Sequence, residues 1–136
     1  MKRAVRSRRK VYGQLLKHAR RQPHRECCGI LAGQDGLITQ AFPTKNVAAD
    51  PVRNYEIAPK EIVRLMGQFR ERRLEFLGIY HSHPDCDAYF SRTDLQNSCP
   101  WYSFVVLSIQ KGEFHHANSW LPNFEQTEAA KEELIY

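Results

Sequence analysis

The stretch Glu75–Pro84 reads EFLGIYHSHP, and the interpretation of the whole chain starts from it. Its apolar run, residues 76–80, is typical of a buried β-strand. Residues two apart on a strand lie on one face, so the imidazoles of His81 and His83 are expected to point toward the same place. Pro84 has no N–H to donate and is expected to end the strand.

A carboxylate follows this strand at Asp94, and two imidazoles with one carboxylate make a three-ligand set. Such a set leaves a fourth position open, which is typical of catalytic rather than structural zinc. Ser91 and Asp94 have the spacing of a helix N-cap and its capping-box partner, so a helix is expected to begin there. The alternative is that His81 and His83 are ordinary strand residues and that the other two only cap the helix.

Glu26 opens a second apolar run, ECCGILAG, which predicts another buried strand. A catalytic zinc site needs a base that takes a proton from the attacking water and returns it to the leaving group. Glu26 suits this role if its strand lies beside the one that carries His81; otherwise it is a solvated charge. The Ser91 hydroxyl could hydrogen-bond the oxyanion formed on an attacked carbonyl.

The rest of the chain reads as helices and strands of one domain, residues 1–136. Apolar residues at helical spacing predict helices over 8–21 and from Pro59 to about 73, and Asn123 is expected to cap a last helix through about 135. Strands are predicted over 37–42, 55–57, 101–109 and 113–120. This order favours an α/β sandwich around a mixed sheet.

The net charge of +5 comes from one end of the chain. Residues 1–25 contain ten Lys and Arg and no acid, whereas residues 26–136 contain the other ten and all fifteen acids. The basic segment, about residues 1–10, is expected to be a solvated, partly disordered tip, and nucleic-acid binding is the less favoured alternative. No apolar run is long enough for a signal peptide or a membrane span, so no membrane partner is expected.

Four cysteines, at positions 27, 28, 86 and 99, lack the CxxC spacing of a zinc finger. Cys27 and Cys28 lie within an apolar run and are expected to be buried rather than to act as nucleophiles. Cys86 and Cys99 flank the presumed metal loop, and the sequence leaves open whether they form a disulfide. Because no export signal is found, a reducing cytoplasm is the expected location.

Taken together, Glu26, residues 81–84, Ser91 and Asp94 resemble the motif of the JAMM/MPN+ zinc metallopeptidases. That motif runs Glu…His-x-His-Pro-x6-Ser-x2-Asp, and every position is filled. The similarity extends to the ECCGILAG strand and the 46–55 loop of small stand-alone prokaryotic members, and it leaves residues 1–10 outside.

The resemblance implies a cytidine-deaminase-like three-layer sandwich and a zinc-dependent peptidase or isopeptidase with one catalytic Zn²⁺. It implies that His81, His83 and Asp94 bind the metal, that Glu26 is the general acid/base and that Ser91 stabilises the oxyanion. The implied substrates are ubiquitin-like or sulfur-carrier proteins with a Gly-Gly C-terminal tail. The particular substrate and the oligomeric state are not implied.

Two rival functions are weighed against this interpretation. A zinc nucleobase deaminase needs His-x-Glu and Pro-Cys-x-x-Cys, whereas the chain has Cys99 and Pro100 in the reverse order. A metal-free scaffold or binding module of the same fold is the alternative from another class, and the complete ligand set disfavours it. His115 and His116 alternate faces on a late strand, so at most one of them is expected to face the site.

Overall fold

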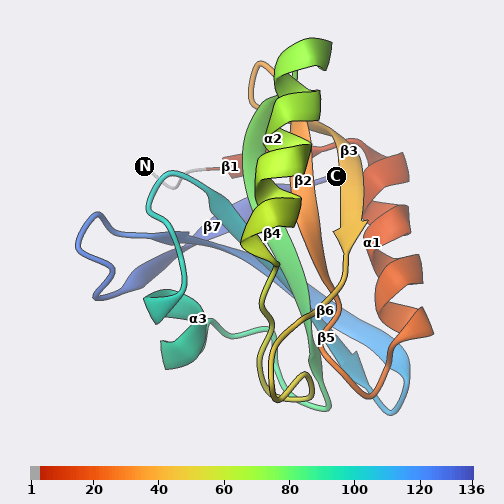
Figure 1. The fold of residues 1–136 in the computed structure, drawn as a ribbon. Coiled ribbons are helices and arrows are strands. Elements are labelled where there is room, and N and C mark those ends of the chain that lie inside the picture. Colours follow the sequence, from red (N-terminus) through yellow and green to blue (C-terminus); the bar gives the residue numbers. More distant parts are fainter. Residues whose placement is uncertain (1–3) are drawn as a thin grey trace.

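The computed structural model describes residues 4–136, which form three helices and seven strands (Figure 1). In chain order these are β1 (Ala4–Ser7), α1 (Arg9–Arg21), β2 (Cys28–Gln34), β3 (Leu37–Thr44), α2 (Pro59–Arg72), β4 (Glu75–Pro84), α3 (Arg92–Gln96), β5 (Ser103–Gln110), β6 (Glu113–Pro122) and β7 (Ala129–Ile135).

The seven strands form one mixed sheet that closes on itself in the order β1-β3-β2-β4-β5-β6-β7. β1 completes the ring because it pairs in parallel with β3 and with β7. β4 and β5 also run parallel, and the other neighbouring strands are antiparallel. The predicted α/β fold with a mixed sheet is confirmed, whereas its division into three layers stays a prediction.

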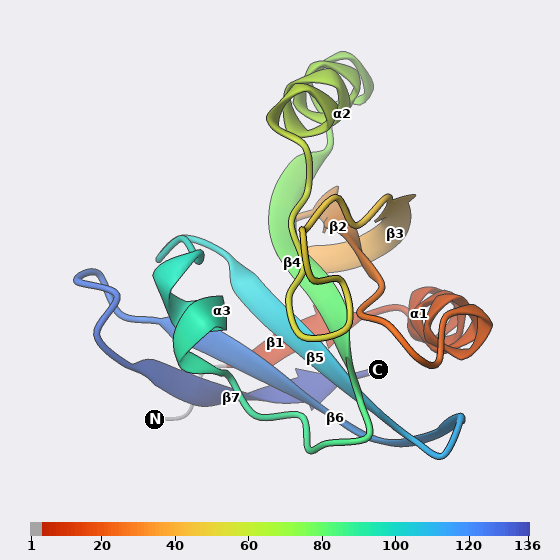
Figure 2. The same cartoon turned by 60° about the horizontal axis from the view of Figure 1, so that its bottom comes forward.

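β2 is buried on both faces, which explains its unbroken apolar sequence. Leu31 packs in one core cluster with Leu15 of α1. Ile30, which points the opposite way, packs in a second cluster with Leu65 of α2. Figure 2 shows β2 lying between the two helices, so the helices cover opposite faces of the same strand.

The predicted C-terminal helix is wrong, because residues 129–135 form β7. The segment AAKEELI is rich in helix formers, but β7 pairs with β6 through Ser119 and Glu132 and with β1 through Val5 and Leu134. Pairing on both sides outweighs the intrinsic preference of the segment. Asn123 shapes a turn instead of capping a helix, since its Oδ1 accepts hydrogen bonds from two backbone N–H groups that follow it.

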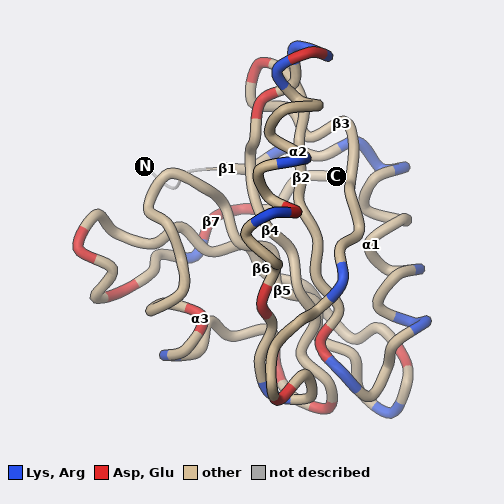
Figure 3. Tube along the Cα trace, in the orientation of Figure 1, with Lys and Arg blue, Asp and Glu red and all other residues tan. Residues whose placement is uncertain are grey.

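The expectation of a solvated N-terminal tip is also wrong for residues 4–7, which form β1 and precede the helix. Val5 is only 6% exposed and belongs to the core cluster that α1 covers. Lys2 and Arg3, which contribute to the predicted basic tip, lie outside the described residues. The basic residues of α1 are distributed along the helix (Figure 3) and are Arg9, Lys10, Lys17, Arg20 and Arg21.

Three smaller outcomes concern the surroundings of the site. Residues 55–57, predicted as a strand, are not part of any strand. Glu26 precedes β2 by two residues rather than opening it. Cys86 is exposed, and it and Cys99 are free thiols, so the structure contains no disulfide between them.

Within residues 4–136, none of the helices has the length and apolar character required to span a bilayer.

Candidate metal centre

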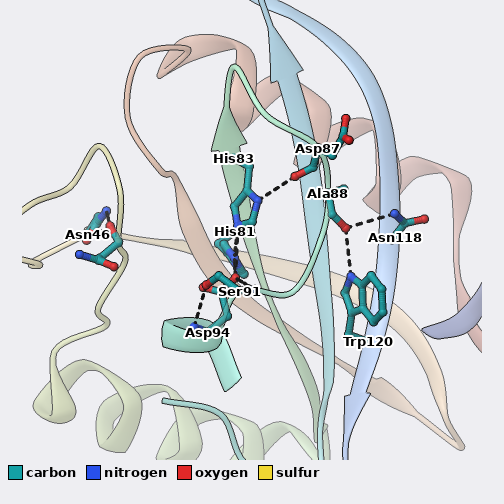
Figure 4. Close-up of polar contacts among 10 residues, drawn as sticks. Asn46, His81, His83, Asp87, Ala88, Ser91, Asp94, Asn118 and Trp120 are labelled. Atoms are coloured by element: carbon teal, nitrogen blue, oxygen red, sulfur yellow. Dashed lines mark hydrogen bonds and ion pairs between the residues drawn. The ribbon is translucent and has the colours of Figure 1, made fainter. Parts of the chain in front are cut away.

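Three side-chain atoms at the end of β4 and the start of α3 form an equilateral triangle. His81 Nε2 and His83 Nε2 lie 3.2 Å apart, and each lies 3.2 Å from Asp94 Oδ2 (Figure 4). Glu26 completes a four-residue cluster, Glu26, His81, His83 and Asp94, whose donor atoms all lie within 4.8 Å of one another. All four residues are buried.

Local sequence explains how the two histidines and the aspartate reach one point. His81 and His83 alternate with Ser82, whose hydroxyl turns the other way and accepts a hydrogen bond from Cys27 N at 2.9 Å. Asp94 is oriented by the capping box of α3: its Oδ2 accepts from Ser91 N at 3.0 Å, and Ser91 Oγ accepts from Asp94 N at 2.9 Å. The same contacts therefore start the helix and aim its carboxylate.

Glu26 is held next to the histidines by the strand pairing and by its own backbone. Cys28 pairs with His81, so the residues just before β2 lie beside the end of β4. Glu26 N donates to Pro51 O at 2.8 Å, and Glu26 O accepts from Asn46 Nδ2 at 2.9 Å. The predicted adjacency of the two strands is thus observed.

The donor atoms fit a tetrahedral zinc ion. Atoms bound at about 2.0–2.1 Å in tetrahedral directions lie about 3.3 Å apart, close to the spacing of the triangle. His83 Nδ1 donates to Asp87 O at 2.9 Å, and because a carbonyl only accepts, His83 Nε2 carries a lone pair that can bind a metal. Glu26 Oε1 is buried and has no hydrogen-bond partner among the described residues, as expected of a group that acts on a water or a substrate.

Burial and neighbouring charges shift the pKa values of the four residues in different directions. Burial raises the pKa of Glu26 to about 8, with His83 opposing this rise and Asp94 adding to it. Burial disfavours the ionised form of Asp94, but the contacts with His81 and His83 outweigh it and lower the pKa of Asp94. Burial lowers the pKa of His81, whereas at His83 it is outweighed by the hydrogen bonds with Asp94 and Asp87 O, which raise the pKa.

Residues 8–122 match the protein family described as prokaryotic homologs of the JAB domain. The chain belongs to this family. JAB is the same family as the JAMM/MPN group that the sequence motif resembles, so the expected family is confirmed.

Two curated JAB relatives carry the names of hydrolases. A desampylase from Haloferax volcanii is 38% identical over 101 residues, which cover 69% of this chain and 73% of that protein. A CysO-cysteine peptidase from Mycobacterium tuberculosis is 29% identical over 109 residues, covering 78% and 74%. The solution structure of protein DSY2949 from Desulfitobacterium hafniense superposes with a TM-score of 0.81 at 26% identity, covering 95% of this chain and 90% of that one.

One hollow of this JAB domain is lined by members of the four-residue cluster, and a second lies next to it at Tyr55, which stacks on His81. The smaller, of about 360 Å³, opens over Glu26, His83 and Ser91. The larger, of about 500 Å³, lies between the 48–57 loop and α3. The larger hollow is lined by Ala48, Ala49, Asn54, Tyr55, Glu56, Ile57, Ile62, Ile79, Thr93 and Asn97.

Three residues that support the site were not singled out by the sequence. The Asn46 side chain forms hydrogen bonds with five backbone groups and thereby ties the 46–56 loop to Glu26. Tyr55 stacks on the His81 ring with centroids 4.3 Å apart. Asp87 supplies its carbonyl to His83. Each contact involves a backbone group or a ring face, so these contacts leave no signature in a motif.

Proposed function

We propose that this chain is a zinc-dependent peptidase or isopeptidase that hydrolyses an amide bond at the C-terminus of a ubiquitin-like or sulfur-carrier protein. The observation that carries the proposal is the 3.2 Å triangle of His81, His83 and Asp94 with the buried Glu26 carboxylate beside it. Four buried titratable groups in one place cost stability unless they bind a cation. A metal-free scaffold or binding module would gain nothing from them, so we favour the enzyme.

The three side chains of the triangle would hold the ion, and Glu26 would act on the reacting water. Zinc held there would supply a Lewis acid, which would lower the pKa of a water to about 7 and polarise the scissile carbonyl. The Glu26 carboxylate takes a proton from the attacking water and gives it to the amine nitrogen as the C–N bond breaks. One water is consumed, and the products are a carboxylate and a free amine.

Ser91 would stabilise the negative charge that develops on the attacked carbonyl oxygen. Its Oγ accepts a hydrogen bond from Asp94 N, which leaves the hydroxyl hydrogen to be donated. Ser91 lines the hollow that also contains Glu26 and His83, so the donated hydrogen can reach a substrate in that hollow. A donor fixed by a helix cap needs little reorganisation during the reaction.

The proposed substrate class rests on the named activities of the two relatives and on the shape of the site. The metal centre is buried, and the larger hollow beside it is lined by Ala48 and Ala49 among others. Glycine lacks a side chain, so a Gly-Gly tail could bring its backbone close to buried metal ligands. We also propose that the enzyme works in the cytoplasm, because all four cysteines are free.

Incubation with Gly-Gly-tailed ubiquitin-like proteins from the same genome, each extended by a short peptide or a cysteine, tests this function. Mass spectrometry should show cleavage directly after the second glycine when zinc is present. Glu26→Gln should retain zinc and lose turnover, because Gln cannot accept the proton. Cleavage by this variant at the wild-type rate would remove Glu26 from its role, and uncut substrates throughout the panel would contradict the proposed function.

A further inference from the structure

The face of the sheet that carries the metal ligands continues with polar side chains onto β6. β4 and β5 pair His83 with Ser108, and β5 and β6 pair Ser108 with His116. Asn118 and Trp120 follow at alternate positions on β6, so they share the face of His116. A row of side chains from three strands therefore lies beneath the segment that joins β4 to α3.

This connecting segment, residues 85–90, is fastened to β6 through the backbone of Ala88. The Asn118 amide and the Trp120 indole both donate to Ala88 O, at 3.1 and 3.0 Å (Figure 4). Ala88 is 0% exposed, so water does not compete for these backbone groups. Buried backbone groups need partners within the protein, and here β6 supplies them.

The peptide group between Asp87 and Ala88 links two histidines. Its carbonyl accepts from His83 Nδ1 at 2.9 Å, and its N–H donates to His116 Nε2 at 3.0 Å. Because His116 accepts at Nε2, its own proton lies on Nδ1, which donates to His115 Nδ1 at 2.7 Å. Consecutive hydrogen bonds polarise one another. An acceptor for the Ala88 N–H therefore makes the Asp87 carbonyl a stronger acceptor for His83.

We propose that His116 is a positioning residue for the zinc ligand His83 and acts on it through this shared peptide group. The inference rests on the proposed function, because it takes His83 to be a metal ligand. A histidine whose second nitrogen donates to a fixed carbonyl keeps one tautomer and one ring orientation. His116 holds that carbonyl in place from its far side, and the Asn118 and Trp120 contacts prevent the next peptide group from turning.

The test compares zinc affinities of full-length variants, measured by competition with a chromophoric chelator. His116→Leu keeps a similar volume but removes the acceptor, and we expect zinc binding to weaken about three- to tenfold, because partners one bond nearer the metal give about 10–100-fold. His116→Gln places an oxygen where Nε2 lies and should restore wild-type affinity. Glu113→Leu is the matched control, since Glu113 is exposed on the same strand, takes no part in these hydrogen bonds and should leave zinc binding unchanged.

The proposal would be overturned if His116→Leu bound zinc with wild-type affinity. It would also be overturned if the Leu and Gln variants lost zinc affinity equally, because a packing role would not distinguish a hydrogen-bond acceptor from a methyl group. If the Leu variant does not fold, the wild-type protein still decides. A scalar coupling across the hydrogen bond between Ala88 N and His116 Nε2 is expected in its NMR spectrum, and the absence of this coupling would overturn the proposal.

The two proposals fail in different ways. Zinc affinities that follow the acceptor at position 116, in a protein that cleaves no substrate, would support the positioning role and contradict the proposed peptidase. Cleavage of a Gly-Gly tail, with zinc affinity insensitive to position 116, would support the peptidase and contradict the positioning role of His116.

Discussion

Replacing Glu26 by Gln should change how the stability of the metal-free protein depends on pH. Glu26 is 4% exposed, and burial raises its pKa from 4.5 to about 8. Between these two values the folded state keeps a proton that the unfolded state has released. The contribution of this group to stability is therefore complete below about pH 4.5 and is lost as the pH rises to about 8.

The size of this effect follows from the shift. Each pKa unit corresponds to about 1.4 kcal/mol, so the free energy of unfolding should fall by a few kcal/mol, and on the order of 5 kcal/mol at most, over this range. Gln does not ionise and escapes this loss. The stability of Glu26→Gln relative to wild type should therefore increase with pH by about that amount, while the titration of groups that do not interact with Glu26 cancels in the comparison.

Urea unfolding with a chelator present, at several values between about pH 5 and 8, measures the difference. Glu61→Gln is the control, because Glu61 lies on the surface of α2 beside Arg64 and its pKa is lowered by that contact. Its stability relative to wild type should stay constant over this range. A difference between Glu26→Gln and wild type that is equally independent of pH would refute the reasoning.

Three further substitutions have distinct expected outcomes. Ser91→Ala should lower kcat about 10²–10³-fold and destabilise the protein by about 1 kcal/mol through the lost N-cap. Ser91→Thr keeps a hydroxyl and should retain most of the activity and most of the stability. A kcat of Ser91→Ala equal to that of the wild type would contradict the oxyanion role. Asp94→Asn keeps an oxygen for the capping box but loses its charge, so metal analysis should show less than one zinc per chain while helix α3 persists. Asn46→Ala leaves several backbone groups without their hydrogen-bond partner and should lower the free energy of unfolding by about 2–4 kcal/mol in urea titrations. A loss below about 0.5 kcal/mol would contradict this role of Asn46.

The sequence predicts correctly those features that depend on residues close to one another along the chain. Alternation along β4 placed His81 and His83 on one face, and the spacing of Ser91 and Asp94 predicted a capping box that the structure contains. The first and second helices were predicted to within about two residues for the same reason, since their apolar faces repeat at helical spacing.

Features that depend on distant partners were not predictable in this way. β7 has the composition of a helix and is a strand only because β1 and β6 pair with it. The role of Asn46 depends on a hydrogen bond to Glu26 O, a partner 20 residues away in the sequence. His116 reaches the metal-ligand segment through a register that contains a bulge between Ser108 and Ile109, which no periodicity reveals.

The most direct test of a single catalytic zinc in the four-residue cluster is a titration of the metal-free protein with Zn²⁺, with the rate of cleavage of a Gly-Gly-tailed substrate recorded at each addition. The account predicts that the rate rises linearly and stops rising at one zinc per chain, and that Asp94→Asn shows no such break. Activity that is unchanged in the presence of chelator, or that appears without any dependence on zinc, would contradict it.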